Sequence, residues 1–164
     1  MNLTTPVRRV TIFCRNLEAS LRCYRDLLGF TVIEDKRIRG PAIGRMLGLA
    51  DCTMRIMHLR SGESPDGLIG LYAIEDGRPA ELPRPDSSSI HLGQCVIVVE
   101  THRLADVEPK VRALGYPVVS ELKSYVKTEP SAYMPVGTYS ELIFLDPDGV
   151  AVNVVQYEPP ATSS

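Results

Sequence analysis

The chain has 164 residues, of which 44% are hydrophobic and 23% charged, a composition typical of a soluble globular protein. No run approaches the roughly 18 apolar residues of a membrane-spanning helix, and the N-terminus lacks the basic-then-apolar pattern of a secretory signal, so we expect a cytoplasmic protein with no membrane partner. Residues 1–60 hold 11 basic and 5 acidic residues, and residues 61–164 hold 7 and 15. Because the arginines are dispersed and have few aromatic neighbours for stacking, we expect no binding to nucleic acid.

The first half of the sequence predicts a strand, a helix and then three further strands. The segment VRRVTIFC (7–14) is rich in the β-branched and aromatic residues that strands favour. An apolar stripe at helical spacing follows it, made of Leu17, Leu21, Tyr24 and Leu28. Asn16 is placed to cap the start of this helix, and Gly29 is placed to end it in the left-handed conformation. The segments TVIED, TMRIMHL and LIGLYAI are strand-like, and the turn PDG at 65–67 separates the last two.

The second half has the same order of elements. The segment IHLGQCVIVV (90–99) is strand-like, and a second helical stripe consists of Leu104, Val107, Val111 and Leu114. Proline is tolerated only in the first turn of a helix, so we expect this helix to begin a residue or two before Pro109, with Asp106 as its cap. A second PDG turn, at 147–149, separates the strand-like segments SELIFL and VAVNVVQYE.

Corresponding landmarks of the two halves have nearly equal spacing, which indicates an internal duplication. The helix-ending glycines Gly29 and Gly115 are 86 residues apart, and the turn glycines Gly67 and Gly149 are 82 apart. Two segments fit neither repeat, RIRGPAIGRMLGLAD and KSYVKTEPSAYMPVGTY, at 37–51 and 123–139. They occupy matching places between the second and third strands, where they would form either the rim of a binding site or surface decoration.

We therefore expect one domain (1–164) built from two tandem βαβββ modules. The first module spans 7–74 and the second spans 90–158. The Pro- and Ser-rich segment 75–89 would link them, and 159–164 would be a tail.

Three segments carry a resemblance to a known family: NLEASLRCYRDLLGF, GRMLGLADCTMRIMHLRSG and LIFLDPDGVAVNVVQ. Together they resemble the vicinal oxygen chelate superfamily, which includes glyoxalase I, bleomycin-resistance proteins, extradiol dioxygenases and methylmalonyl-CoA epimerase. The resemblance implies an α+β fold in which the two modules form a curled, eight-stranded mixed sheet, a cup with the helices outside. It also implies a homodimer. Because this fold hosts many chemistries, it does not settle the function.

Members of this family that use a metal resemble one another in placing His, Glu or Gln on the first and last strands of each module. Carried over to this sequence, the four positions fall on Arg9, Gly70 (or Leu71), Gln94 and Asn153. Arginine repels a divalent cation, glycine has no donor, and the two amides are weak ligands. We therefore expect no metal cofactor, and the alternative is a divalent metal ion held in a different register.

Arg9 is the most informative of these residues. Inside a cup its guanidinium would bind a carboxylate, phosphate or enolate of a small-molecule ligand through two hydrogen bonds. Two alternatives stay open: a structural ion pair between Arg9 and an acidic residue such as Glu141, and a strand shifted by one residue so that Arg8 faces inward.

His58 and Glu141 lie on the third strands of their modules and are the candidate catalytic residues, as a general acid and base. A lone histidine on a strand can equally be a hydrogen-bonded core residue. Four tyrosines could stack on an aromatic ligand or serve only in packing: Tyr72, Tyr125, Tyr133 and Tyr139.

Two functions follow from these expectations. The first is a metal-free binding protein of the glyoxalase/bleomycin-resistance type, in which Arg9, Gln94, Asn153, Tyr139 and Tyr133 hold a hydrophobic or anionic ligand. The second is an enzyme of the isomerase, lyase or dioxygenase type. Such an enzyme would either use His58 and Glu141 without a metal or use a metal in a different register.

Overall fold

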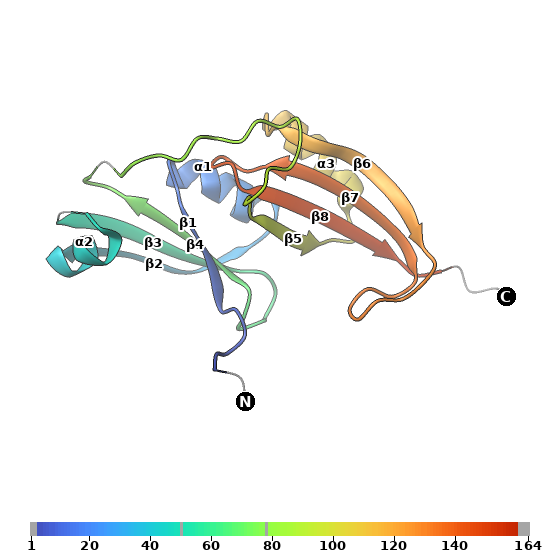
Figure 1. The fold of residues 1–164 in the computed structure, drawn as a ribbon, viewed down its shortest axis with the longest axis horizontal. Helices are drawn as coiled ribbons and strands as arrows, with labels where there is room; N and C mark the ends of the chain where they lie inside the picture. The colour runs from blue at the N-terminus through green and yellow to red at the C-terminus, as the bar shows by residue number, and fades with distance from the viewer. Residues whose placement is uncertain (1–2, 50, 78, 161–164) are drawn as a thin grey trace. The chain divides into compact units, whose positions relative to one another are not determined.

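The computed structural model describes residues 3–49, 51–77 and 79–160. They fall into two compact units that divide between Arg84 and Pro85, inside the expected linker (Figure 1). Each unit contains one four-stranded sheet with its own helices.

The first unit is a βαβββ module with one added helix. Its elements are β1 (Arg9–Phe13), α1 (Leu17–Leu21), the π-helix η1 (Arg22–Leu27), β2 (Thr31–Gly40), α2 (Pro41–Leu47), β3 (Cys52–Arg60) and β4 (Leu68–Ile74). The strands lie in the order β1-β4-β3-β2, with β1 parallel to β4 and the other pairs antiparallel.

The second unit repeats this topology without the added helix. Its elements are β5 (Val96–Glu100), α3 (Leu104–Ala113), β6 (Val118–Lys127), β7 (Gly137–Leu145) and β8 (Ala151–Glu158). The strand order is β5-β8-β7-β6, again with one parallel pair, β5 with β8. The predicted α+β fold with tandem βαβββ modules is confirmed, and the eight strands form two four-stranded sheets.

The first helical segment begins and ends where the sequence predicts. The side chain of Asn16 accepts a hydrogen bond from the backbone N–H of Ala19 at 3.0 Å, which satisfies one of the unpaired amides of the first turn. At the other end Gly29 has a φ of +79°, and the backbone N–H of Phe30 turns back to the carbonyl of Tyr24 at 2.9 Å. Between these ends, the last six residues form a π-helix, which periodicity alone does not predict.

The predicted start of the second helix, by contrast, is wrong. Helix α3 begins at Leu104, so Pro109 lies inside it and Asp106 lies in its first turn rather than at its cap. The first turn is held by contacts with β8: Leu104 is buried, and its backbone N–H donates to Gln156 Oε1 at 2.9 Å. This external acceptor and the burial of Leu104 outweigh the loss of one backbone hydrogen bond at the proline.

The two segments that fit neither repeat lengthen the strands only in part. In the first, β2 continues to Gly40 and only 41–47 form a new element, α2. In the second, β6 continues to Lys127, and a loop then leads into β7 at Gly137. The first segment therefore connects β2 to β3 mainly through a helix, and the second forms the end of the β6–β7 hairpin.

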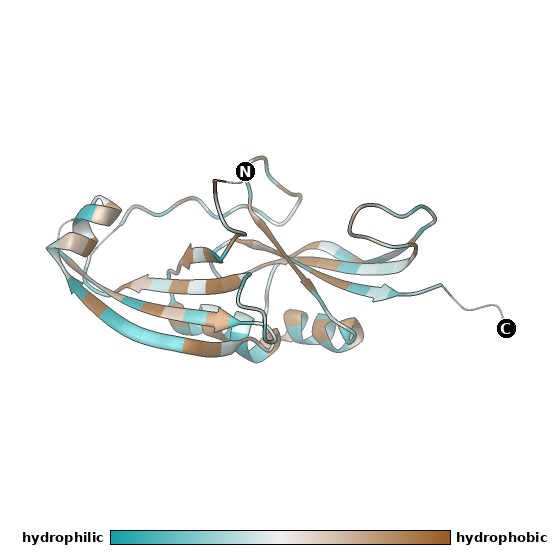
Figure 2. Ribbon diagram, turned by 90° about the horizontal axis from the view of Figure 1, so that it is seen from below, coloured by the Kyte–Doolittle hydropathy of each residue, from teal (hydrophilic) through white to brown (hydrophobic). Residues whose placement is uncertain are grey.

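Each sheet buries one face against its helix, and its opposite face carries side chains that are partly exposed. Apolar and polar residues alternate along the strands, as Figure 2 shows by colour. In the first unit Leu59 and Leu71 are fully buried, whereas their neighbours His58 and Tyr72 on the opposite face are only partly buried. The second unit has the same arrangement, with Phe144 fully buried under α3 and Asn153 partly exposed on the opposite face.

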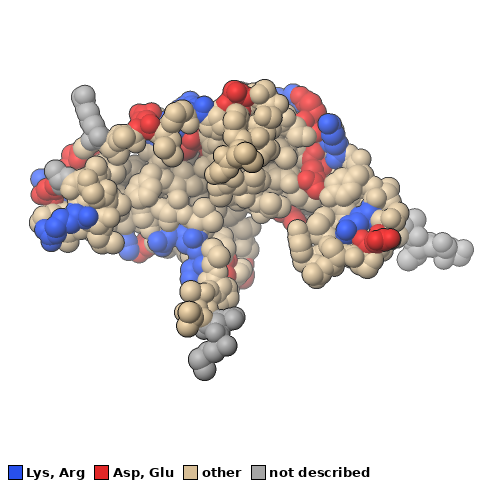
Figure 3. Space-filling model, in the orientation of Figure 1, with Lys and Arg blue, Asp and Glu red and all other residues tan. Residues whose placement is uncertain are grey.

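Basic and acidic side chains are interspersed over the visible surface of the molecule (Figure 3). Within the described residues, no helix is long and apolar enough to cross a membrane.

Candidate functional site

Four strands of the first unit bring together a group of polar side chains that we call the Arg9 face: Arg9, Thr11, Glu34, His58 and Tyr72. Strand pairing explains the grouping, because His58 lies opposite Gly70 on β4, and Gly70 in turn lies opposite Thr11 on β1. Gly70 leaves an opening in the middle of this face.

Arg9 fills the opening at Gly70. A Cβ atom added at Gly70 would lie 2.8 Å from Arg9 Cδ and 3.2 Å from Arg9 Nε, well inside van der Waals contact. The arginine side chain therefore crosses β4 over the glycine and reaches β3. Position 70, which the resemblance assigns to a ligand, holds no side chain, and the side chain of Arg9 occupies its space.

His58 is held by three partners that together define its protonation. Arg9 Nη1 lies 2.9 Å from His58 Nε2, and since a guanidinium can only donate, Nε2 must accept. The proton therefore sits on Nδ1, which lies 2.5 Å from Glu34 Oε2. The Tyr72 hydroxyl, 3.0 Å from Nε2, is then a second donor to the same nitrogen.

The same surroundings favour the neutral ring of His58. Burial lowers the pKa of His58 first, and the positive charge of Arg9 lowers it further, while the carboxylate of Glu34 opposes both effects. Glu34 is shared with a cation, because its other oxygen binds Lys36 Nζ at 2.7 Å. His58 thus presents the accepting nitrogen Nε2 beside a fixed positive charge.

Arg9 has no carboxylate partner among the described residues of its own unit. Its Nε donates to Thr11 Oγ1 at 3.0 Å, and its guanidinium carbon lies 5.4 Å from the centre of the Tyr72 ring. Arg8, in contrast, points the other way and forms an exposed ion pair with Asp66 at 2.8 Å. Of the two arginines, Arg9 is therefore the one on the face with His58, and its charge is available to an anion.

In the second unit, five side chains form what we call the Glu141 face: Tyr125, Tyr139, Glu141, Asn153 and Tyr157. Glu141 Oε1 accepts from the Tyr125 hydroxyl at 2.7 Å, and Oε2 accepts from Asn153 Nδ2 at 2.8 Å. The hydrogen bond to Glu141 raises the pKa of Tyr125 to about 12, because the carboxylate stabilises the protonated phenol. Glu141 is thus bonded through both oxygens to neutral groups of its own unit.

The tyrosines of the Glu141 face stack across three neighbouring strands. Ring centres lie 5.6 Å apart for Tyr125 and Tyr139, and 5.1 Å apart for Tyr139 and Tyr157. Tyr139 is only 3% exposed and donates to the Pro135 carbonyl at 3.0 Å, so it packs inside the stack. Tyr133 lies in the β6–β7 loop and is 86% exposed.

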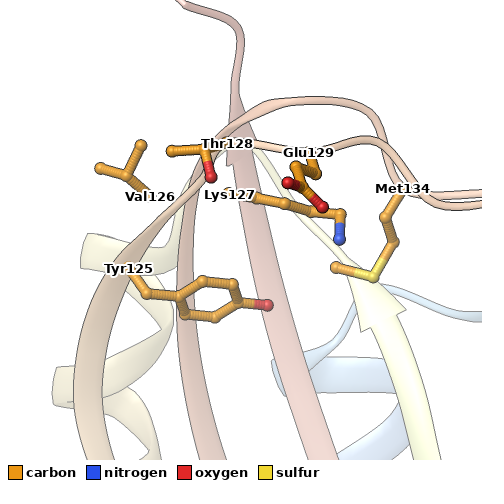
Figure 4. A pocket seen from close by; sticks show the side chains of 6 residues that line it. All are labelled: Tyr125, Val126, Lys127, Thr128, Glu129 and Met134. Atoms are coloured by element: carbon orange, nitrogen blue, oxygen red, sulfur yellow. The ribbon is translucent and has the colours of Figure 1, made fainter.

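Beside Tyr125, the end of the β6–β7 hairpin forms an open hollow of about 380 Å³ (Figure 4). It is lined by Tyr125, Val126, Lys127, Thr128, Glu129 and Met134. The close-up shows the Tyr125 ring on one side of this hollow and the sulfur of Met134 on the other.

The structure corrects one of the four family positions. Gln94 lies in the loop before β5, where Nε2 donates to the Gly149 carbonyl at 3.3 Å and Oε1 accepts from the backbone N–H of His91 at 3.1 Å. The prediction that Gln94 lies on the first strand of its module is therefore wrong. Strand pairing places Val96 at the position that corresponds to Arg9.

The same comparison shows that His58 and Glu141 do not occupy equivalent positions. His58 lies opposite Gly70, whereas the residue opposite Asn153 is Ile143, two residues after Glu141. Both candidate catalytic residues are on the third strand of their module, as expected, but each is bonded within its own unit. The duplicated modules have diverged into two chemically different faces.

The residues at the four family positions do not fit a metal ion. They are Arg9, Gly70, Val96 and Asn153, and only the amide of Asn153 has a donor atom for a cation. Nor does any group of three or more His, Cys, Asp or Glu side chains gather among the described residues.

Sequence reasoning missed Glu34 and Thr11, and gave Tyr72 only the alternatives of stacking on a ligand or packing. Glu34 reaches His58 because of an irregularity in the β2–β3 pairing between Val32 and Glu34. Since residues 37–51 were expected to interrupt this hairpin, the register across it could not be counted from the sequence. Thr11, however, was detectable, because it lies two residues from Arg9 and so faces the same side of the strand.

Comparisons with known proteins agree with this architecture. The sequence model of the Glyoxalase/Bleomycin resistance protein/Dioxygenase superfamily matches residues 7–154. No curated protein matches the chain.

Among solved structures, a glyoxalase family protein from Bacillus cereus is similar at 14% identity, with a TM-score of 0.63 over 96% of this chain and 95% of that one. Glyoxalase I from Leishmania major is similar at 13% identity, with a TM-score of 0.58 over 93% and 87%. An antibiotic-binding protein from a Streptomyces species is similar at 14% identity, with a TM-score of 0.50 over 96% and 100%. At these identities the likeness concerns the fold.

Proposed function

The chain belongs to the glyoxalase/bleomycin resistance protein/dioxygenase superfamily, and on this basis we propose that it binds a small organic anion without a metal ion. The observation that carries the proposal is the position of Arg9. Its guanidinium lies over Gly70, at a position where relatives that use a metal hold a ligand, and no described carboxylate of its unit neutralises it.

The surroundings of Arg9 favour an anion that has an apolar part. Tyr72 Oη and His58 Nε2 lie beside the guanidinium, so an anion there meets fixed charge and a polar wall. Phe13, four residues after Arg9 on β1, is 51% exposed and packs its ring edge-on to Tyr72 at 5.8 Å. This combination suits an aromatic or aliphatic carboxylate. The antibiotic-binding protein of similar fold supports the use of such a scaffold for binding.

Titration calorimetry with 1-naphthoate as the probe anion tests the proposal. Replacing Arg9 with Gln should weaken binding at least about tenfold, because a charge-assisted hydrogen bond contributes about 1.5–3 kcal/mol. Arg8→Gln is the matched control. It removes the same charge from the residue next to Arg9, whose side chain forms an exposed ion pair with Asp66. Equal losses in the two variants, or none in Arg9→Gln, would refute a specific anion site.

A second function is favoured by one observation, the arrangement of Glu34 and His58. Glu34 holds the proton of His58 on Nδ1, so Nε2 could take a proton from a bound molecule that displaces the Tyr72 hydroxyl from it. In this alternative the protein is an isomerase or lyase, with His58 as the base, Glu34 orienting its ring and Arg9 stabilising the negative charge that develops.

Hydrogen–deuterium exchange tests this alternative. Simple 2-oxo acids such as pyruvate are incubated with the protein in D₂O, and loss of their C–H signals is followed by proton NMR. An enzyme of this kind would accelerate exchange, and His58→Gln would abolish the acceleration. If the protein exchanges the protons of a panel of such acids no faster than buffer alone does, the enzyme alternative is refuted and binding remains as the proposed function.

A further inference from the structure

We infer that the Glu141 face is a separate binding site for an organic ammonium group, such as a primary amine attached to an aromatic ring. This site lies wholly within the second unit. It goes beyond the proposed anion site, and neither depends on the other.

The first argument is the uncompensated charge of Glu141. The residue is partly buried, and its oxygens accept only from a phenol and an amide, both neutral. Among the described residues of the second unit, none forms an ion pair with it. A partly buried carboxylate is stabilised by hydrogen bonds and further by a cation. A bound positive charge would therefore stabilise Glu141.

The second argument is that a neighbouring acceptor atom lacks a hydrogen-bond donor and that a second carboxylate lies on the same face. Asn153 Oδ1 is buried with no hydrogen-bond partner, on the side chain whose amide donates to Glu141. Strand pairing sets Glu100 on the same face, opposite Val155 and two residues beyond Val98, which pairs with Asn153. Burial raises the pKa of Tyr139 most, and the neighbouring Tyr157 and the Glu100 carboxylate raise it further.

The third argument is the aromatic surface beside the carboxylate. Tyr125 is 44% exposed, stacks on Tyr139, and donates its hydroxyl to Glu141. A cation near Glu141 would therefore meet the electron-rich face of a ring that is held in place at its hydroxyl. The hollow next to Tyr125 has space for the apolar part of the ligand, against the side chain of Met134 (Figure 4).

Two lysines of β6 lie nearby and set a limit on the affinity. Lys123 is paired with Glu141 across the strands, and Lys127 lines the hollow, but neither forms an ion pair with Glu141 in the described structure. A ligand would have no internal salt bridge to displace. It would, however, be repelled by both lysines, so replacing Lys127, which lines the hollow, with Gln should strengthen binding of a cation.

Divergence between the modules agrees with this assignment. The position of Arg9 is taken by Val96 in the second unit, and the position of Phe13 is taken by Glu100. The first face therefore carries a cation where the second has valine, and the second carries a carboxylate where the first has phenylalanine, which would suit ligands of opposite charge.

Calorimetric titration with benzylamine tests the site, with benzyl alcohol as the neutral probe of the same shape. We expect benzylamine to bind the wild-type protein at least about fivefold more tightly than benzyl alcohol. Glu141→Gln should remove this difference and Lys127→Gln should widen it. Glu158→Gln is the matched control, because Glu158 is an exposed residue of β8 and its replacement changes the charge equally.

Equal binding of the two probes by the wild-type protein would overturn the inference, and so would a difference that survives in Glu141→Gln. If Glu141→Gln fails to fold, Tyr125→Ala serves instead, since loss of the ring should weaken benzylamine more than benzyl alcohol, and equal weakening would count against the site. The anion proposal is tested separately, by titration of wild type and Arg9→Gln with 1-naphthoate. Failure of either titration therefore leaves the other proposal unaffected.

Discussion

Replacing Gly70 with Ala should separate binding from stability, because a single methyl group would enter the space that Arg9 occupies. The added Cβ would lie 2.8 Å from Arg9 Cδ and 3.1 Å from Tyr72 Cε1, whereas carbon atoms in contact are about 3.5–4.0 Å apart, so the Tyr72 ring must also shift slightly. The arginine stem must therefore retreat by about 1 Å. It can do so because Arg9 is exposed and flexible, and Gly70 is not among the glycines with positive φ.

The retreat would weaken two hydrogen bonds, Nη1 to His58 at 2.9 Å and Nε to Thr11 at 3.0 Å. Charge-assisted hydrogen bonds contribute about 1.5–3 kcal/mol, and exposure to solvent reduces this value. We expect a loss of about 1 kcal/mol in anion binding, or about fivefold in the Kd for 1-naphthoate. Stability should be unchanged or slightly higher, since glycine in a strand is about 0.5–1 kcal/mol less favourable than alanine.

Titration calorimetry and urea unfolding of the same protein samples measure the two quantities. In an Arg9→Gln background Gly70→Ala should have no further effect on binding, because the displaced group is already gone. Undiminished affinity in the single variant would refute the role of Arg9, and a stability loss above about 2 kcal/mol would show that the arginine cannot move aside.

Three further predictions concern single groups. The pKa of His58, followed by NMR of its ring protons, should lie below the ordinary histidine value. It should rise in Arg9→Gln and fall further in Glu34→Gln, and an unchanged pKa in Arg9→Gln would contradict the assigned contacts. Because the pKa of His58 is lowered in the folded state, His58 contributes to stability above the ordinary histidine pKa. This contribution is lost as the pH falls through the ordinary pKa toward the folded pKa, and unfolding measurements across this pH range would detect the loss. Ultraviolet titration should show a tyrosine with a pKa of about 12 that is lost in Tyr125→Phe and shifts down toward 10.0 in Glu141→Gln. Because the pKa of Tyr139 is also raised, only an undiminished late step in Tyr125→Phe would exclude Tyr125. Phe144→Ala should cost about 3–5 kcal/mol in unfolding free energy, because the side chain is fully buried, whereas Val126→Ala, at a residue 71% exposed, should change it by less than about 0.5 kcal/mol.

The fold was predictable from local signals that tertiary contacts did not overrule. Asn16 and Gly29 mark the ends of the first helical segment in sequence and in structure, because capping and positive φ depend on neighbouring residues alone. Helix α3 shows the limit of this reasoning. Its first turn depends on an acceptor 52 residues away, Gln156, and no local rule for Pro109 includes that contact.

The candidate site was predictable only in part, because alternation within a strand is local and register between strands is not. Arg9, Gly70 and His58 were identified within their strands, and the structure brings Arg9 and His58 into contact. Glu34 was missed because its contact with His58 depends on a shift in pairing along β2. Gln94 was misplaced because β5 begins only at Val96.

Metal independence of anion binding is the central claim, and one calorimetric experiment tests it most directly. The protein is dialysed against EDTA, titrated with 1-naphthoate, and titrated again after addition of Mn²⁺ or Ni²⁺. We predict the same Kd in all cases, because the guanidinium of Arg9 supplies the positive charge. Binding that disappears after EDTA and returns with the metal would contradict this account.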